Sequence, residues 1–508
     1  MRKWLPYAPA GMPGVWFKAF QMIPTRSGSY YPNNLFTEHG NAAALTSPGT
    51  TLRAWCALRT NDSVLAFMGT TTKLWLYDGV TTFTDLSKVG GYTSTATDWS
   101  FAQYGEITIA ANRVDALQSR DGAAGGAFGD CAGSPPKARI VVAQADQILL
   151  FDLNDGAEKA DAFAACAPGD YTDWSGAGAT TATRIRHRPG PIKAACAFRD
   201  YVLVAKRSSV YKLTYTGSNT YKWRVELIAI GRGAWGKHDL VNCGDSVIMS
   251  GPGGAWKYDG ASWTPITDYV GEIPESKASL FSPLSQNVHF FLAGGLGATV
   301  PEQYTYNLVS DRWGTGKYRF IAAGGGAGIG SGYRPMTGEP AALASFVAPT
   351  VALPDLVFML DGAATTEVLK NSQYWGNGTV GAAQLAAAVI SGFVEGLGGN
   401  TITQFGRLTP EFTMSLRDLA SDPTPGATEL LLNIITSDAP DKLSANGSVT
   451  YASNGLASST TQRRFDFNHA APYARFEIVL PLDSGYVEIT DYKLTSPGGE
   501  VLKAAGSL

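Results

Sequence analysis

The sequence predicts an all-β protein: a β-propeller of about seven blades, with six or eight also compatible, followed by a C-terminal β-sandwich. The first observation is a hairpin pattern of apolar strand, polar turn and aromatic-rich strand, which occupies residues 64–79 and recurs along the chain. The second is its spacing, because successive copies are centred roughly 40 to 65 residues apart, as expected for four-stranded blades. The third is composition, since 58 glycines, 27 prolines and few long helical patterns are typical of short strands joined by turns.

The repeated hairpin supplies the units of the propeller. In the first copy, apolar residues at 64–69 form one strand, residues 70–73 reverse the chain, and residues 74–77 pair back. Further copies occupy residues 147–152, 209–217, 255–263, 303–313 and 356–362. One such sheet alone would expose two apolar faces and two unpaired edges, so the copies must pack around a common axis. Trp99, Phe101 and Ile109 are expected to pack between blades.

The propeller is predicted to span residues 51–395, and residues 1–50 are predicted to form an extended arm. Six prolines in the arm forbid a long helix: Pro6, Pro9, Pro13, Pro24, Pro32 and Pro48. Two interpretations of the arm stay open. It wraps its own propeller and closes the ring, or its four basic residues, opposed by Glu38 alone, dock on an acidic partner.

A second β domain is predicted for residues 396–508. It follows an alanine-rich piece at 385–394, which is expected to form a short helix or a closing strand. Strands are expected at residues 412–416, 429–435, 464–467, 473–480 and 486–494. Prolines separate most of them, which is the pattern of a small sandwich.

Charge and cysteine content exclude several classes of protein. Forty basic and 43 acidic side chains give a net charge of −3, so no global attraction toward nucleic acid or an anionic membrane is expected. Only 16% of residues are charged, which favours a surface partly covered by other subunits. Five cysteines without a CxxC pair indicate reduced thiols made in a cytoplasm. With neither a signal peptide nor a long apolar segment, neither export nor membrane anchoring is expected.

The local basic feature of note is the run Arg184, Arg186 and Arg188, which alternates with Ile185 and His187. On a strand, these three guanidinium groups would share one face. They are candidates for contact with DNA phosphates or an acidic partner. The alternative is a solvated strand or an ion network at a blade edge.

No catalytic, cofactor-binding or metal-binding residues are predicted. The five histidines lack metal-binding spacing and no GxSxG elbow occurs, so His39, His187, His238, His289 and His469 are expected to be surface or satisfied core residues. The acids before glycine at 78, 259 and 361 are expected to cap hairpin turns. Residues 152–156 resemble a calcium loop without its glutamate, and the glycine-rich stretch 324–330 misses the phosphate-binding spacings.

Several of these stretches together resemble a known family. They are the repeated hairpin, residues 90–93 followed by 99–105, the strand 107–112, the blade segment 256–260 and residues 473–476. The chain resembles the propeller-type tail proteins of short-tailed, podovirus-like bacteriophages, the nozzle or stopper. The resemblance covers most of the chain and is weakest in the arm and at 130–195.

The resemblance implies a structural virion protein and not an enzyme, located in the phage tail and, during assembly, in the host cytoplasm. A homo-oligomeric, hexameric ring would sit below the portal and adaptor proteins, contact tail fibres, retain the packaged DNA and serve as its exit channel. Contact with the exiting duplex would be transient and non-specific, and a net charge of −3 is compatible with sliding.

Two other functions stay open. One is a carbohydrate-binding or carbohydrate-active propeller, such as a phage adhesin, in which Trp235, Trp256, Trp263 and Trp313 would stack on sugar rings. The other is a cytoplasmic interaction scaffold of the WD-repeat type.

Overall fold

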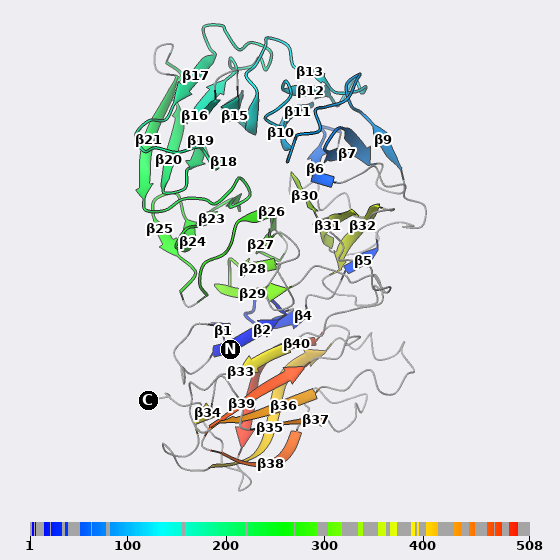
Figure 1. The fold of residues 1–508 in the computed structure, drawn as a ribbon, viewed down its shortest axis with the longest axis vertical. Helices are drawn as coiled ribbons and strands as arrows, with labels where there is room; N and C mark the ends of the chain where they lie inside the picture. The colour runs from blue at the N-terminus through cyan, green and yellow to red at the C-terminus, as the bar shows by residue number, and fades with distance from the viewer. Residues whose placement is uncertain are drawn as a thin grey trace.

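The computed structural model contains β-strands throughout the part of the chain that it describes, with no helix there (Figure 1). That part comprises residues 3–4, 6, 15–20, 22–32, 36–38, 51–61, 63–77, 82–154, 158–218, 222–268, 270–283, 285–292, 303–316, 334–338, 354–361, 366–372, 388–391, 394–395, 403–414, 431–437, 447–452, 465–471, 473–479 and 487–495. The all-β class expected from the sequence is therefore confirmed. In these residues no helix is long and apolar enough to cross a membrane.

Four blades are separate four-stranded sheets whose strands pair in chain order. The second blade is β10 (Ser100–Tyr104), β11 (Ile107–Ala111), β12 (Gln118–Asp121) and β13 (Gly129–Asp130). The third is β14 (Ala138–Gln144), β15 (Gln147–Asn154), β16 (Glu158–Ala165) and β17 (Thr180–Arg184). The fourth is β18 (Ala194–Phe198), β19 (Tyr201–Ala205), β20 (Ser209–Tyr215) and β21 (Trp223–Ile230). The fifth is β22 (Leu240–Asn242), β23 (Val247–Gly251), β24 (Gly254–Tyr258) and β25 (Trp263–Pro265).

The first and sixth blades belong to larger sheets. The first is β6 (Thr51–Leu58), β7 (Val64–Thr70), β8 (Leu74–Tyr77) and β9 (Phe83–Asp85), and it continues through β30 (Arg334–Gly338), β31 (Pro354–Asp361), β32 (Thr366–Ser372) and β5 (Phe36–Glu38). The sixth is β26 (Ser276–Ser282), β27 (Asn287–Leu292), β28 (Gln303–Asn307) and β29 (Arg312–Gly316). The six blades surround an axis in the upper part of Figure 1.

The blade count is six and not the seven taken as most probable from the repeat, although six was within the expected range. The copy at 356–362, expected as a blade of its own, falls on β31. Its neighbour β30 pairs in parallel with the innermost strand β6, with Met336 opposite Ala54. These strands therefore extend the first blade's sheet, because backbone pairing joins them to it edge to edge.

Aromatic side chains fill the spaces between blades, as expected from the sequence. Trp55 of the first blade stacks on Phe101 of the second, with ring centroids 5.5 Å apart. Trp99 is fully buried beside them and donates its indole N–H to the Thr70 carbonyl at 2.8 Å. Ile109 faces the third blade in a separate core cluster. The predicted packing of Trp99, Phe101 and Ile109 between blades is confirmed.

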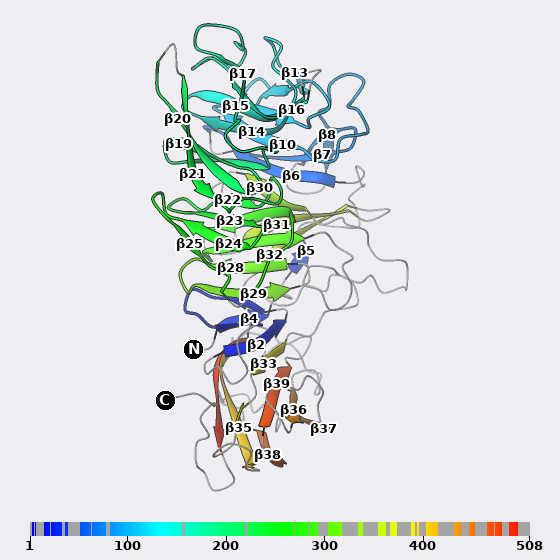
Figure 2. The same cartoon turned by 60° about the vertical axis from the view of Figure 1, so that its left-hand side comes forward.

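Strands from the N-terminal region lie between the sixth blade and the C-terminal strands (Figures 1 and 2). They are β1 (Lys3–Trp4), β2 (Val15–Phe20), β3 (Met22–Pro24) and β4 (Tyr30–Pro32). β2 pairs with both β29 and β33. Tyr30 donates its hydroxyl to the Trp313 carbonyl at 3.1 Å, and Ser310 donates to the Thr25 carbonyl at 2.8 Å. The described part of this region is thus paired within its own chain.

The C-terminal strands belong to two sheets. β33 (Ala388–Ser391), β34 (Val394–Glu395), β36 (Leu431–Ser437), β37 (Gly447–Ala452) and β39 (Tyr473–Val479) join the sixth blade through β2 in an eleven-stranded sheet. β35 (Thr403–Met414), β38 (Phe465–Ala471) and β40 (Val487–Thr495) pair with β3 and β4. Each C-terminal strand expected from the sequence overlaps one of these strands, and the alanine-rich piece contains a strand at β33.

Candidate functional site

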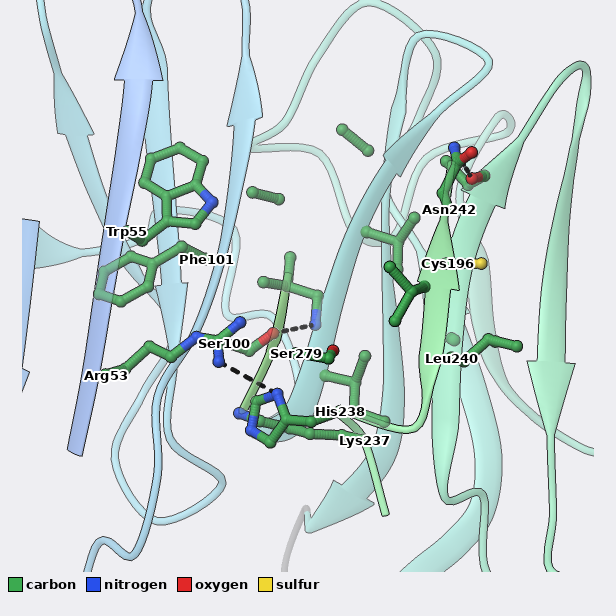
Figure 3. Close-up of a pocket in the computed structure, with 18 of the residues that line it drawn as sticks. Arg53, Trp55, Ser100, Phe101, Cys196, Lys237, His238, Leu240, Asn242 and Ser279 are labelled. Carbon is green, nitrogen blue, oxygen red and sulfur yellow. Dashed lines mark hydrogen bonds between the residues drawn. The ribbon is translucent and has the colours of Figure 1, made fainter. Parts of the chain in front are cut away.

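The innermost strands of the six blades line an open cavity of about 420 Å³ on the propeller axis (Figure 3). Its wall includes residues from β6, β10, β14, β18, β22 and β26, so every blade contributes to it. The wall combines valine, alanine and leucine of the innermost strands, which pack well there, with polar side chains such as Gln103 and Asn242. The cavity is therefore a direct product of ring closure.

Four ionisable side chains meet at one end of this cavity, and we call them the axial cluster: Arg53, Asp98, Lys237 and His238. Asp98 Oδ2 lies 2.8 Å from Lys237 Nζ and 2.8 Å from His238 Nε2. Arg53 Nη1 lies 3.1 Å from His238 Nδ1, as the dashed line in Figure 3 shows. Lys237 Nζ also donates to the Trp99 carbonyl at 2.6 Å. The cluster joins the first, second and fifth blades across the axis.

The electrostatics of the cluster fix the protonation state of its histidine. Burial and, to a smaller extent, the charge of Arg53 lower the pKa of His238 to about 3, against the raising effect of Asp98. A neutral imidazole has one donor and one acceptor nitrogen. Since an arginine can only donate, His238 Nδ1 accepts from Arg53 and Nε2–H donates to Asp98.

Asp98 and Lys237, two of the three charged residues in the cluster, stabilise each other's ionised form. Burial opposes ionisation of Asp98, but Lys237 and the other cluster residues outweigh it and hold the pKa of this carboxyl well below its usual range. Burial lowers the pKa of Lys237 to about 8, with Asp98 working against that shift. At neutral pH the axial cluster therefore carries two cations and one carboxylate.

Asp239, next along the chain, links the fifth blade to the sixth. Its Oδ1 accepts from the Ser250 hydroxyl at 2.8 Å and from the Ser276 N–H at 3.1 Å. Its Oδ2 accepts from the Gly236 N–H at 2.8 Å. Burial raises its pKa to about 6 despite these bonds. Asp239 thus positions the turn that carries Lys237 and His238.

An aspartate–histidine pair is also the core of a general base, but this pair is not arranged as one. A general base needs a ring nitrogen within reach of a substrate proton. His238 Nδ1, which would take that proton, is occupied by Arg53. The cavity wall instead presents Arg53 and Lys237, and none of its described residues is a carboxylate. The arrangement therefore does not suit proton transfer.

The predicted partner-contact residues lie elsewhere, at the outer edge of the third blade. β17 ends at Arg184, so the expectation that Arg184, Arg186 and Arg188 share one strand face is wrong. After Arg184 the chain leaves the sheet, and Pro189 and Gly190, which favour a turn, follow Arg188. All three arginines are exposed, and Arg184 Nε donates to Asp161 Oδ1 at 2.7 Å.

A buried lysine holds the backbone of this basic segment. Lys206 Nζ donates to the carbonyls of Ile185 and Arg188, at 2.6 and 2.7 Å. Lys206 is 1% exposed, and burial lowers its pKa. The structure thus fixes the backbone between Ile185 and Arg188, and it leaves the side chains of Arg186 and Arg188 exposed.

The tryptophans proposed for sugar stacking are mostly committed to packing. Trp256 and Trp313 are buried, which excludes them from stacking on a sugar. Trp263 stacks on Tyr258 with centroids 4.6 Å apart, and the Arg207 guanidinium covers Trp235 at 4.9 Å. The four side chains form no shared sugar-binding surface, and the expectation of four stacking faces is wrong for Trp256 and Trp313.

Of the acids expected to cap hairpin turns, Asp259 is the one whose side chain the structure describes. Asp259 Oδ1 accepts from the N–H groups of Ala261 and Ser262, both at 2.7 Å, while Gly260 takes φ +103°. The predicted turn cap is confirmed there, whereas residues 78–79 and 362 lie outside the described residues. In the calcium-like stretch, Asp152 is held by Arg113 and Arg139, and residues 155–157 lie outside the described part.

Of the two core histidines, His238 is satisfied as predicted, whereas the Nε2 of His289 is buried without a hydrogen-bond partner among the described residues. His238 uses both ring nitrogens, and His289 Nδ1 contacts Thr305 Oγ1 at 2.9 Å. His187 is exposed. His39 lies outside the described residues, and the side chain of His469 does too.

Sequence reasoning missed the axial cluster. The available signal was that Asp98 directly precedes the second blade's innermost strand, and Lys237 and His238 precede that of the fifth. Charged residues before a strand are common at solvated turns, so nothing local distinguishes them. Only closure of the ring brings residues 140 positions apart into contact.

Comparison with known proteins does not assign the chain to a family. No protein-family model matches the chain, and no curated protein matches it. Among solved structures, the computationally designed Ika8 protein is 11% identical over 64% of this chain and 99% of its own, with a TM-score of 0.37. An extracellular domain described as that of a hybrid two-component system from B. thetaiotaomicron is 11% identical over 73% of this chain, with a TM-score of 0.43.

This chain spans 42% of that extracellular domain, and another structure of the domain gives 40% with a TM-score of 0.44. Likenesses this weak carry no argument about function. The strand pairing itself places the chain among the six-bladed β-propellers.

Proposed function

We propose that this chain is a non-enzymatic structural protein of a short phage tail, a nozzle or stopper subunit that assembles into a hexameric ring below the portal and adaptor proteins. The proposal rests on the resemblance of its strand and turn segments to that family. In this role the ring retains the packaged DNA, contacts tail fibres and provides the exit channel. The subunit is made in the host cytoplasm and ends in the virion tail.

The observation that supports it best is the eleven-stranded sheet. β29 of the sixth blade pairs with β2, β2 with β33, and β33 with β39. Backbone hydrogen bonds therefore run from the propeller into the C-terminal strands. This continuous pairing would let the subunit carry mechanical load between the propeller and the C-terminal strands.

The C-terminal strands are part of the proposal as a β-sandwich domain over residues 396–508. Their two sheets would pack face to face, each burying one side, as in other small sandwiches. In a ring, this domain and the N-terminal strands would provide the contacts to neighbouring tail proteins.

The DNA path in this proposal lies between subunits and not through one propeller. The axial cavity measures 420 Å³ and the axial cluster lies across one end of it. A duplex whose major groove alone is about 12 Å wide cannot pass there. The central hole of the ring would therefore form the channel, and its lining would decide how easily DNA slides.

Native mass spectrometry and electron microscopy of the purified chain, alone and with an adaptor ring, test this function. A hexameric ring that binds the adaptor is the expected result, and cryo-electron microscopy of intact particles should place it at the tail. A permanently monomeric protein that binds or cleaves surface polysaccharide would overturn the proposal in favour of an adhesin.

A further inference from the structure

We propose that β21, the outer strand of the fourth blade, pairs antiparallel with β21 of a second copy of this chain. The two strands would be centred on Val225, so that Arg224 of each copy lies opposite Glu226 of the other. This contact is independent of the tail assignment, because a two-fold contact joins only two chains, whereas a ring of six needs a separate head-to-tail surface. The length of the edge, its backbone groups and its charges support the contact.

β21 is the longest of the outer strands whose free edge no described strand covers. It has eight residues, whereas β9, β13, β17 and β25 have two to five. The outer strand of the sixth blade, β29, is paired with β2. β21 ends its own sheet and lies at the left margin of the propeller in Figure 1. Short outer strands and covered edges prevent pairing between chains, and β21 has neither protection.

Alternate residues of β21 turn their backbone groups toward this open edge. The Thr216 N–H donates to the Lys222 carbonyl at 2.9 Å, so these two residues form a hydrogen-bonded pair. Hydrogen-bonded and non-hydrogen-bonded positions alternate along an antiparallel pair. Because the register with β20 is unbroken over residues 223–227, every second residue there directs its N–H and C=O away from β20. These residues are Trp223, Val225 and Leu227.

The spacing of these three residues lets the strand pair with a copy of itself. In a two-fold pairing centred on Val225, Trp223 of one copy lies opposite Leu227 of the other, and Val225 lies opposite its own equivalent. All of these are positions at which facing residues exchange both N–H···O=C bonds. The pairing would therefore satisfy every outward-directed backbone group of residues 223–227.

The charges on the exposed face of β21 favour the same register. Arg224 Nη2 lies 3.6 Å from Glu226 Oε2, and the two side chains are 71% and 48% exposed. In the two-fold pairing, four charges would alternate in sign, along each strand and across the pair. Opposite charges on facing residues stabilise a sheet, and like charges destabilise it. A register centred on Arg224 or on Glu226 would instead place two like charges opposite each other.

The other face of β21 is anchored in its own blade. Trp223 is 8% exposed and belongs to a core cluster shared by the third and fourth blades, with Val225 and Leu227 packed against it. The strand is thus held extended before any partner arrives. Pairing then requires little further ordering, which lowers the entropy cost of association.

Sedimentation velocity and native mass spectrometry of the purified chain test this contact. We expect a two-chain species with a Kd on the order of 10 to 100 μM, because one pair of edge strands is a small interface. Arg224→Glu would place two carboxylates on each strand and Glu226→Arg two guanidinium groups. Either variant alone should weaken the pairing by at least about tenfold, since like charges would then face each other.

Mixing the two variants gives the most specific test. An Arg224→Glu chain opposite a Glu226→Arg chain has opposite charges at both facing positions, so the mixture should form a species with one chain of each. The double variant Arg224→Glu/Glu226→Arg exchanges the two charges and should associate like the unsubstituted chain. Restored association in both cases would require the proposed register.

Two further variants serve as controls for charge and for backbone pairing. Asp245→Arg makes the same change of charge as Glu226→Arg at an exposed hairpin tip, and it should leave association unchanged. Val225→Pro removes the central outward-directed N–H without breaking a bond to β20, and it should abolish the two-chain species.

The proposal is overturned if the unsubstituted chain forms no two-chain species at about 500 μM, well above the expected Kd. It is also overturned if Arg224→Glu alone associates as strongly as the unsubstituted chain, or if the mixture of variants fails to associate. Native mass spectrometry separates the two-chain species from the proposed hexameric ring, so the failure of one does not decide the other.

Discussion

The imidazole of His238 in the fifth blade donates its Nε2–H to Asp98 in the second blade at 2.8 Å. Two blades that are not neighbours in the ring are thereby connected through their innermost ends. Because Arg53 of the first blade bonds the other ring nitrogen, the imidazole bridges three blades. Ring closure at this end thus relies on buried polar contacts in addition to the apolar packing between blades.

The first prediction concerns the carboxylate of this bridge. Asp98→Asn keeps the shape of the side chain but removes the charge that balances Lys237. Breaking one partner of a buried ion pair should lower the free energy of unfolding by about 3 kcal/mol, near the lower end of the usual range because Asp98 keeps 23% exposure. Urea unfolding measures it. Asp245→Asn, on an exposed hairpin tip, is the matched control, and equal stability of the two variants would contradict the role of Asp98.

The second prediction concerns acid. Burial lowers the pKa of His289 from 6.5 to about 3, so between those values the unfolded chain binds a proton there that the folded chain does not. His238 behaves alike, and stability therefore falls as the pH drops below 6.5. Asp239 acts oppositely between 3.8 and about 6, because its raised pKa keeps a proton on the folded chain.

Two variants should therefore change the pH dependence in opposite directions. His289→Gln should make the loss of stability between pH 6 and 4 shallower, and Asp239→Asn should make it steeper, each by about 1.4 kcal/mol per pH unit. Urea unfolding across this pH range gives the slopes. Unchanged slopes would mean that these groups titrate normally in the folded protein.

The third prediction tests packing between the first two blades. A Cβ added at Gly69 would lie 2.4 Å from Trp99 Cδ1, and Trp99 is fully buried. Gly69→Ala should therefore destabilise the protein by about 2 kcal/mol, since the buried indole must shift to make room for the added atom. Thermal unfolding compares it with Gly129→Ala in β13, where nothing lies within 4 Å of the added atom. Equal melting temperatures would contradict the packing.

The fourth prediction concerns the exposed basic segment of the third blade. Arg186→Glu combined with Arg188→Glu should weaken ring assembly or adaptor docking, because both side chains are exposed while Lys206 fixes their backbone. Arg184→Ala is the control, since Arg184 is already engaged with Asp161. The fraction of assembled ring, measured by native mass spectrometry at low and high salt, is the readout. Full assembly of the double variant would remove this segment from the subunit interface.

The features on the outer strands and turns of the blades could be predicted from the sequence only in part. Alternation of arginine with Ile185 and His187 suggested a strand over the whole segment, but the strand ends at Arg184. The Asp259 turn was predictable because an aspartate before glycine bonds its own backbone, which requires only neighbouring residues. The burial of Trp256 and Trp313 could not be predicted from the sequence, because the exposure of a side chain on one blade depends on which residues of its neighbours cover it.

The sequence by itself determined the all-β class, the hairpin repeat and most strand positions, because alternation, aromatic content and turn residues act over a few neighbouring positions. Only the tertiary structure decided that the copy at 356–362 joins the first blade's sheet, since an edge can pair with any strand that reaches it. It alone placed Asp98 against His238, because closing a ring juxtaposes strand ends far apart in the chain, and no local pattern records which ends will meet.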